Sequence, residues 1–112
     1  MTPKDDRVYL GHIREAIDRI REYTKGGAEV FKSDIKTQDA VYRNFEVIGE
    51  DIKRISEDLK SRHPNVDWRK ATAMRDVLVH DYAVIDVQTI WSTVERDLPK
   101  LAASLEEVKP VN

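Results

Sequence analysis

One short segment carries side chains that could do chemistry together. Residues 74–82 read Met-Arg-Asp-Val-Leu-Val-His-Asp-Tyr, which gives an Arg-x4-His-x-Tyr pattern at the end of an apolar stretch. Cleavage of a phosphodiester requires one proton to leave the attacking hydroxyl, another to reach the leaving oxygen, and a cation to balance charge at phosphorus. An imidazole exchanges protons near neutral pH, and a guanidinium binds phosphate oxygens in a bidentate manner. We therefore predict catalysis by Arg75 and His80, with Asp76 orienting one of them and Tyr82 contacting the substrate.

The spacing of Arg75 and His80 constrains the site. At about 100° per residue the two side chains lie roughly 140° apart around an ideal helix. Either the helix unwinds near His80, or the site gathers these residues from two chains. Separate acid and base roles need two imidazoles, and the motif supplies one per chain, so we predict a homodimer with both motifs at one two-fold seam. The alternative is a capping and packing group, with His80 over the helix C-terminus, where a cation is favoured.

Apolar periodicity predicts the elements that position this motif. Val41, Phe45, Ile48, Ile52, Ile55 and Leu59 alternate steps of four and three residues, which is typical of one helical face. We expect long helices over residues 4–24, 37–62, 68–80 and 86–107, and a short turn of helix over 28–32. Asp67 and Asp86 should cap the third and fourth helices, and Pro99 should kink the last one about four residues upstream. The predicted fold is all-α, an up-down antiparallel bundle of four long helices plus a short one.

Composition favours a small globular domain and argues against several classes of site. The chain has 112 residues, of which 40% are hydrophobic and 36% charged, and it has no cysteine. We expect one domain over residues 1–108 and a disordered tail over 109–112. The absence of cysteine and of a long apolar run predicts a cytoplasmic protein that does not enter the membrane. The three histidines lie far apart, so we expect no metal and no cofactor.

The charge distribution favours a local basic patch. The net charge is −2, yet residues 53–75 contain seven basic and three acidic side chains. Such a patch could attract phosphates. Solvated helix faces are the alternative.

The motif and its surroundings resemble the HepT subgroup of the HEPN ribonucleases. The similar stretches are Gln38-Asp39-Ala40, residues 43–50 (Arg-Asn-Phe-Glu-Val-Ile-Gly-Glu), His63-Pro64, Val66-Asp67-Trp68, Trp91-Ser92-Thr93-Val94 and Asp97-Leu98-Pro99. Two positions depart from the family pattern: Asp76 stands where Asn is common, and Ala83 where an aromatic is common.

The resemblance implies an activity, a partner and a control point. It implies a HEPN-like fold and a dimeric, metal-independent endoribonuclease toxin that leaves a 2′,3′-cyclic phosphate. It also implies a minimal nucleotidyltransferase antitoxin that adenylylates the motif tyrosine, which here is Tyr82. Anionic AMP beside Arg75 and His80 would block the site and repel an RNA phosphate.

Other residues have two interpretations each. Asn44, Glu46 and Glu50 could line the active-site groove or form a solvated flank. We expect His12 to be exposed and without a role, and His63 to contact the C-terminus of a helix. Trp68 and Trp91 are interpreted as core or interface anchors.

Two other functions stay open for the whole chain. One is a catalytically silent HEPN-like binding module that partners a nucleotidyltransferase. The other is a purely structural helical dimerisation domain.

Overall fold

A computed structural model describes residues 5–80 and 86–109, in which every regular element is helical. In chain order these elements are α1 (Asp6–Tyr23), α2 (Ala28–Ser33), α3 (Ile35–Arg54), α4 (Glu57–Arg62), α5 (Trp68–His80), α6 (Val87–Ser92), the π-helical segment η2 (Thr93–Asp97) and α7 (Leu98–Leu105). The described helices do not include one that is long and apolar enough to cross a membrane.

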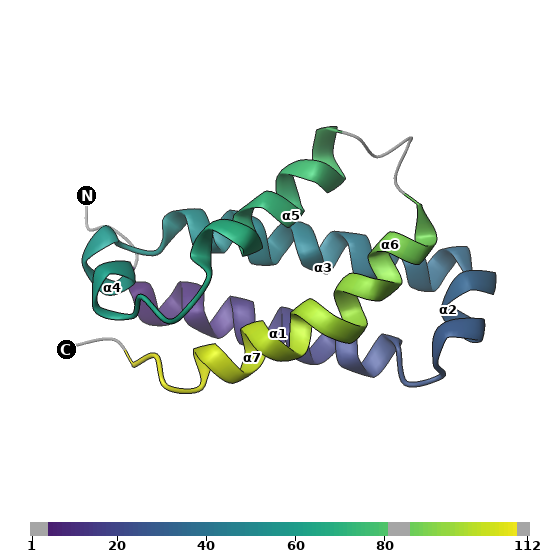
Figure 1. Ribbon diagram of the computed structural model, residues 1–112, viewed down its shortest axis with the longest axis horizontal. Helices are drawn as coiled ribbons and strands as arrows, with labels where there is room; N and C mark the ends of the chain where they lie inside the picture. Colours follow the sequence, from purple (N-terminus) through teal and green to yellow (C-terminus); the bar gives the residue numbers. More distant parts are fainter. Residues whose placement is uncertain (1–4, 81–85, 110–112) are drawn as a thin grey trace.

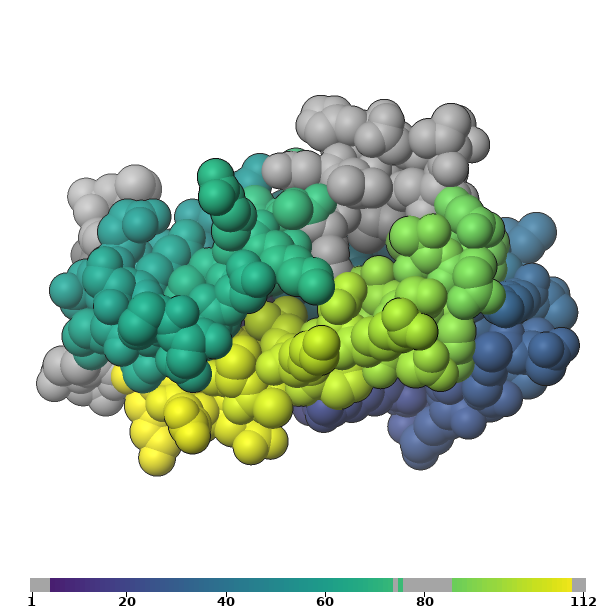
Figure 2. Space-filling view, in the orientation of Figure 1, coloured from purple at the N-terminus to yellow at the C-terminus, as the bar shows by residue number. Residues whose placement is uncertain are grey.

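The elements form an up-down antiparallel bundle, as the sequence predicts. α1 and α3 run side by side in opposite directions, and α5 returns along α3 (Figure 1). α6, η2 and α7 form the last leg, which covers much of α1 on the face shown in Figure 2. Toward its C-terminal end α5 rises away from the other helices (Figure 1).

The buried face of each helix is the apolar stripe seen in the sequence. Leu10, Ile13, Ile17 and Ile20 of α1 meet Val41, Phe45, Ile48 and Ile52 of α3, all at most 3% exposed. Each such side chain contributes about 1.5–3 kcal/mol through removal from water. α2 closes one end of the bundle with Phe31, whose ring lies 5.5 Å from the ring of Trp91.

The expectation of one continuous helix over residues 37–62 is wrong. α3 ends at Arg54, Ile55 is extended, and α4 begins at Glu57. Ser56 caps α4, since its Oγ accepts from the Leu59 amide at 3.1 Å. Asp6 of α1 stabilises the non-helical link between α3 and α4. Its carboxylate accepts hydrogen bonds from the Ser56 amide at 2.9 Å and from the Ser56 hydroxyl at 2.6 Å. The apolar stripe itself is confirmed, since Ile55 and Leu59 are buried.

The last leg carries the distortion expected upstream of Pro99. Asp86 caps α6, as predicted, by accepting from the Gln88 amide at 3.2 Å. The chain then widens into η2, at whose end the Leu98 amide donates to the Thr93 carbonyl five residues back. Pro99 lacks the amide hydrogen that a regular helix would use, so a π-helical turn accommodates it without ending the leg.

Candidate active site

The motif helix α5 meets α3 at an unusually close crossing. Gly49 is buried in α3 at this point, and Arg75 of α5 packs directly on it. A Cβ atom at position 49 would overlap Cβ and Cγ of Arg75 and lie 3.4 Å from its Cα. Only a residue without a side chain permits this approach, so Gly49 sets where Arg75 stands.

The guanidinium of Arg75 is partly buried and faces an acid. Its side chain is 22% exposed, and Nη2 lies 3.7 Å from Oε1 of Glu50, the residue after Gly49. Glu50 is itself only 35% exposed. Partial burial reduces solvent screening, so this pair orients the guanidinium more firmly than a surface pair would.

The remaining motif residues are described only in part. Asp76 and His80 lie on α5, whose backbone is helical through His80, but their side chains lie outside the described part of the chain. Tyr82 also lies outside the described residues. Because the helix does not unwind before His80, the rise from Arg75 is that of a regular helix, about 7.5 Å. Unwinding is thus absent between Arg75 and His80, and residues 81–85 lie outside the described part of the chain.

The three residues expected at the groove differ in their surroundings. Asn44 is buried at 6% exposure, and its amide donates to the Ala40 carbonyl of its own helix at 2.8 Å. Glu46 is partly buried one turn before Glu50. Of this group, Glu50 is the one that the described contacts bring against Arg75.

A polar cluster between α1 and α3 was not apparent from the sequence. Asp51 has a side chain only 6% exposed, and its carboxylate lies 3.4 Å from Nδ1 of His12. Arg54 donates to the same carboxylate at 3.3 Å. His12 is exposed, as expected, and it also has a contact in the fold. Only the Asp51–Arg54 spacing was visible in the sequence, since the His12 contact depends on the register of two helices.

Among the side chains that the structure describes, which exclude those of Asp76 and His80, no group of three His, Asp or Glu is arranged to hold a metal ion. His63 ends α4, as expected, and its carbonyl accepts from the indole Nε1 of Trp68 at 3.1 Å.

Comparison with protein families extends the resemblance to nearly the whole chain. A family model described as "Ribonuclease HepT-like" matches residues 13–108, which include the α3–α5 crossing and the whole Arg-x4-His-x-Tyr motif. The chain belongs to the HepT-like ribonuclease family. The structure of this HepT-like ribonuclease thus shows where the arginine of the family motif lies relative to Gly49 and Glu50.

Individual relatives support the same family. This HepT-like ribonuclease is 44% identical to "Probable ribonuclease HepT" of Thermococcus cleftensis, over 90% of this chain and 93% of the relative. It is 37% identical to a "Putative RNase" of Methanocaldococcus jannaschii, over 96% of this chain and 90% of the relative. A second protein of that organism, whose name combines a gamma-glutamylcyclotransferase with a putative RNase, is 37% identical to the chain. This match covers 94% of the chain and 48% of that protein. No solved structure matches the chain.

Proposed function

We propose that this HepT-like ribonuclease is a metal-independent endoribonuclease that works as a homodimer in the cytoplasm. The observation that carries the proposal is the guanidinium of Arg75, held partly buried against Glu50 on a helix that also carries His80. A cation fixed in this way suits a phosphate whose negative charge grows during reaction.

In the proposed reaction His80 would transfer protons and Arg75 would stabilise negative charge. One His80 imidazole takes the proton from a ribose 2′-hydroxyl, and the new bond from the 2′-oxygen to phosphorus forms. The bond from phosphorus to the 5′-oxygen breaks, and an imidazolium gives that oxygen a proton. Arg75 stabilises the extra charge on the phosphoryl oxygens. The products are a 2′,3′-cyclic phosphate and a free 5′-hydroxyl.

We propose a homodimer because one chain supplies a single motif histidine, which points away from Arg75 on a regular helix. On a regular helix the directions of Arg75 and His80 differ by about 140°, and α5 is helical through His80. A partner copy related by a two-fold axis would supply the second imidazole and let each His80 approach the other chain's Arg75.

The biological role would be that of a toxin whose partner is a minimal nucleotidyltransferase antitoxin. Tyr82, two residues after His80 in sequence, is the acceptor for AMP in this proposal. The added phosphate would compete with RNA for Arg75. Asp76 would orient Arg75 or His80.

The experiment is cleavage of labelled RNA by purified protein in the presence of EDTA. We expect cleavage to persist in chelator, to leave cyclic phosphate ends, and to be lost in both Arg75→Ala and His80→Ala. Arg19→Ala and His63→Ala remove the same side-chain types elsewhere and should keep activity. Equal activity of all four variants would refute the assigned residues. Absence of cleavage, together with retained nucleotide or partner binding, would favour a binding module.

A further inference from the structure

A second feature of the α3–α5 face is an open groove beside the motif. It has a volume of about 590 Å³ and lies between α5, the C-terminal end of α3, and α4. Its lining includes Lys53, Lys60, Trp68 and Arg69, together with Glu57. Three cations therefore face one carboxylate, and the groove is basic although the chain as a whole has a net charge of −2.

Two cations of this groove, Lys60 and Arg69, have no buried acid as a described ion-pair partner. Lys60, whose side chain is 17% exposed, lies 3.8 Å from Glu57, which is 92% exposed and can move into solvent. Arg69 is exposed, and among the described residues it has no hydrogen bond or ion pair. Cationic side chains around one concave surface are a typical arrangement for binding a phosphate backbone.

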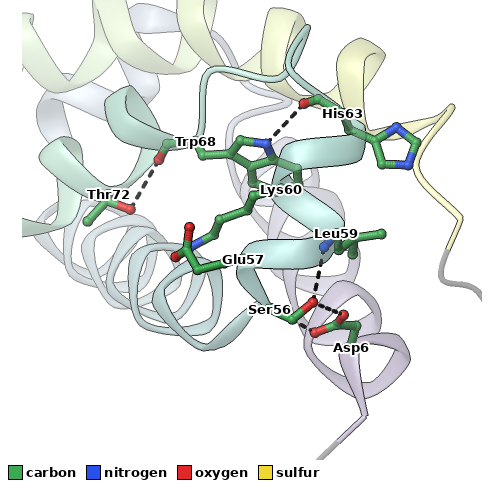
Figure 3. A network of polar contacts seen from close by, with 8 residues as sticks. All are labelled: Asp6, Ser56, Glu57, Leu59, Lys60, His63, Trp68 and Thr72. Carbon is green, nitrogen blue, oxygen red and sulfur yellow. Dashed lines mark hydrogen bonds and ion pairs between the residues drawn. The ribbon is translucent and has the colours of Figure 1, made fainter.

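Trp68 gives the same groove an aromatic wall. Its indole Nε1 donates to the His63 carbonyl at 3.1 Å, which fixes the ring where α5 begins. Figure 3 shows the ring beside the side chain of Lys60, with Glu57 and Thr72 close by. A partly buried ring that lines an open groove can stack with an unpaired base.

The groove lies one helical turn from the candidate active site on both α3 and α5. Lys53 follows Glu50 by one turn of α3, and Thr72, also in the lining, precedes Arg75 by one turn of α5. Each step is about 4.5 Å along its helix. Glu50 and Arg75 contact each other, so both edges of the groove lie close to the guanidinium.

The other groove on α5 differs in charge. It measures about 280 Å³, lies between α5 and α7, and is lined by Asp67, Lys70, Asp97 and Lys100 among others. Two acids balance two cations there, and Lys70 Nζ is 3.0 Å from Asp97 Oδ1. Of these two described grooves, the one nearer Arg75 in the helices therefore has the excess of positive charge.

We propose that the groove of Lys53, Lys60, Trp68 and Arg69 binds the single-stranded RNA that flanks the cleaved bond. This inference rests on the proposed ribonuclease site and adds where its substrate lies. The three cations contact successive phosphates, and Trp68 stacks on a base. A stacked base must be unpaired, so the groove selects single strands over duplex RNA.

The test separates binding from cleavage. A fluorescent single-stranded RNA with every 2′-hydroxyl methylated cannot be attacked, and its affinity is measured over a series of salt concentrations. Arg69→Ala and Lys53→Ala should each weaken binding several-fold and reduce the salt slope by about 0.7, the value for one lost phosphate contact on a single strand. Lys100→Ala, a lysine in the other groove on α5, should bind like the parent. Duplex RNA of the same length should compete weakly.

A cleavage measurement completes the design. Arg69→Ala should raise KM for a long RNA several-fold more than KM for a dinucleotide, because a dinucleotide does not extend into the groove. Equal affinities and salt slopes for the parent, Arg69→Ala and Lys53→Ala would overturn the inference, as would equal binding of duplex RNA. Because the methylated RNA reports binding alone, a failure of the proposed cleavage chemistry would show separately, as intact RNA in the activity assay.

Discussion

Gly49 and Arg75 are packed so closely that Cβ and Cγ of the arginine occupy the place where any other residue at position 49 would have its side chain. The position of the guanidinium is thus set by the absence of a side chain on the neighbouring helix. Glu50, the next residue, then orients the far end of the same arginine.

Gly49→Ala should therefore impair both the fold and the activity. The added methyl group overlaps Cβ and Cγ of Arg75, and such overpacking costs about 1–3 kcal/mol of unfolding free energy. A displacement of the guanidinium by about 1 Å can reduce the cleavage rate on the order of 100-fold. Urea denaturation and RNA cleavage measure the two effects.

Gly11→Ala is the matched control for this substitution. Gly11 lies within α1, and an added Cβ would have no atom within 4 Å. Alanine is the better helix former, so we expect a gain of about 0.5–1 kcal/mol with unchanged cleavage. If both variants kept the parent's activity, Gly49 would have no part in placing Arg75.

Glu50→Gln should lower kcat without raising KM. The substitution removes the charge that orients Arg75 and also removes a repulsion on the RNA phosphate. A lost orientation of about 1 kcal/mol corresponds to about fivefold in kcat, while stability should change by less than about 1 kcal/mol, as for other partly exposed ion pairs. Steady-state cleavage kinetics test this, with Glu15→Gln at an exposed pair of α1 as control. A rise in KM at constant kcat would contradict it.

Asp6 and Ser56 should behave as one unit in stability measurements. Asp6→Ala removes the two hydrogen bonds that fix the start of α4, at a cost of about 1–2 kcal/mol. Ser56→Ala loses the hydroxyl contact and the cap of α4 as well. The double variant should be less destabilised than the sum, because both changes remove a shared interaction. Additive values in urea denaturation would show that the two residues act separately.

Asp34 should make the stability of the protein depend on acid pH. The Thr37 hydroxyl donates to its carboxylate at 2.8 Å and the Lys36 amide at 3.1 Å. The Thr37 bond, followed by the backbone bonds, lowers the pKa of Asp34 below 3.8 in the folded protein. Because the folded pKa is the lower one, the stabilisation is complete above the unfolded pKa and is lost as the pH falls through the folded pKa.

Thermal unfolding between about pH 6 and about pH 2 tests this expectation. Asp34→Asn can still accept at the cap but has no carboxyl to protonate, so its Tm should fall less than the parent's in acid. Thr37→Val removes the donating hydroxyl and should move the loss of stability to higher pH. Parallel Tm curves for the parent and Asp34→Asn would refute the role of this carboxylate.

The sequence predicted the helices well where one physical signal determines them. Steps of three and four apolar residues identified the buried faces of α1 and α3, and Asp67 and Asp86 marked the starts of α5 and α6. The break at Ile55 was missed because its side chain is buried whether the backbone is helical or extended, so the apolar pattern continues across it. The capping serine at position 56 was the available signal.

The candidate site was only partly predictable for a related reason. Arg75 and Glu50 were chosen by residue type, and the structure places them together. The role of Gly49 could not be derived, since it depends on the register between α3 and α5. Asn44 was expected in a groove or on a solvated flank, and its burial excludes the flank. For His80, Asp76 and Tyr82 the assignments stay predictions, because their side chains lie outside the described residues.

The attachment of α5 affects how easily this helix separates from the rest of the bundle. Within the described residues, α5 is attached chiefly to α3, which also packs along α1. Detaching α5 would then require less free energy than melting the whole bundle. Amide hydrogens near the C-terminal end of α5 should exchange with deuterium sooner than those of α1 and α3. A partner protein could in that case inhibit cleavage by displacing α5 alone, while the other helices stay folded.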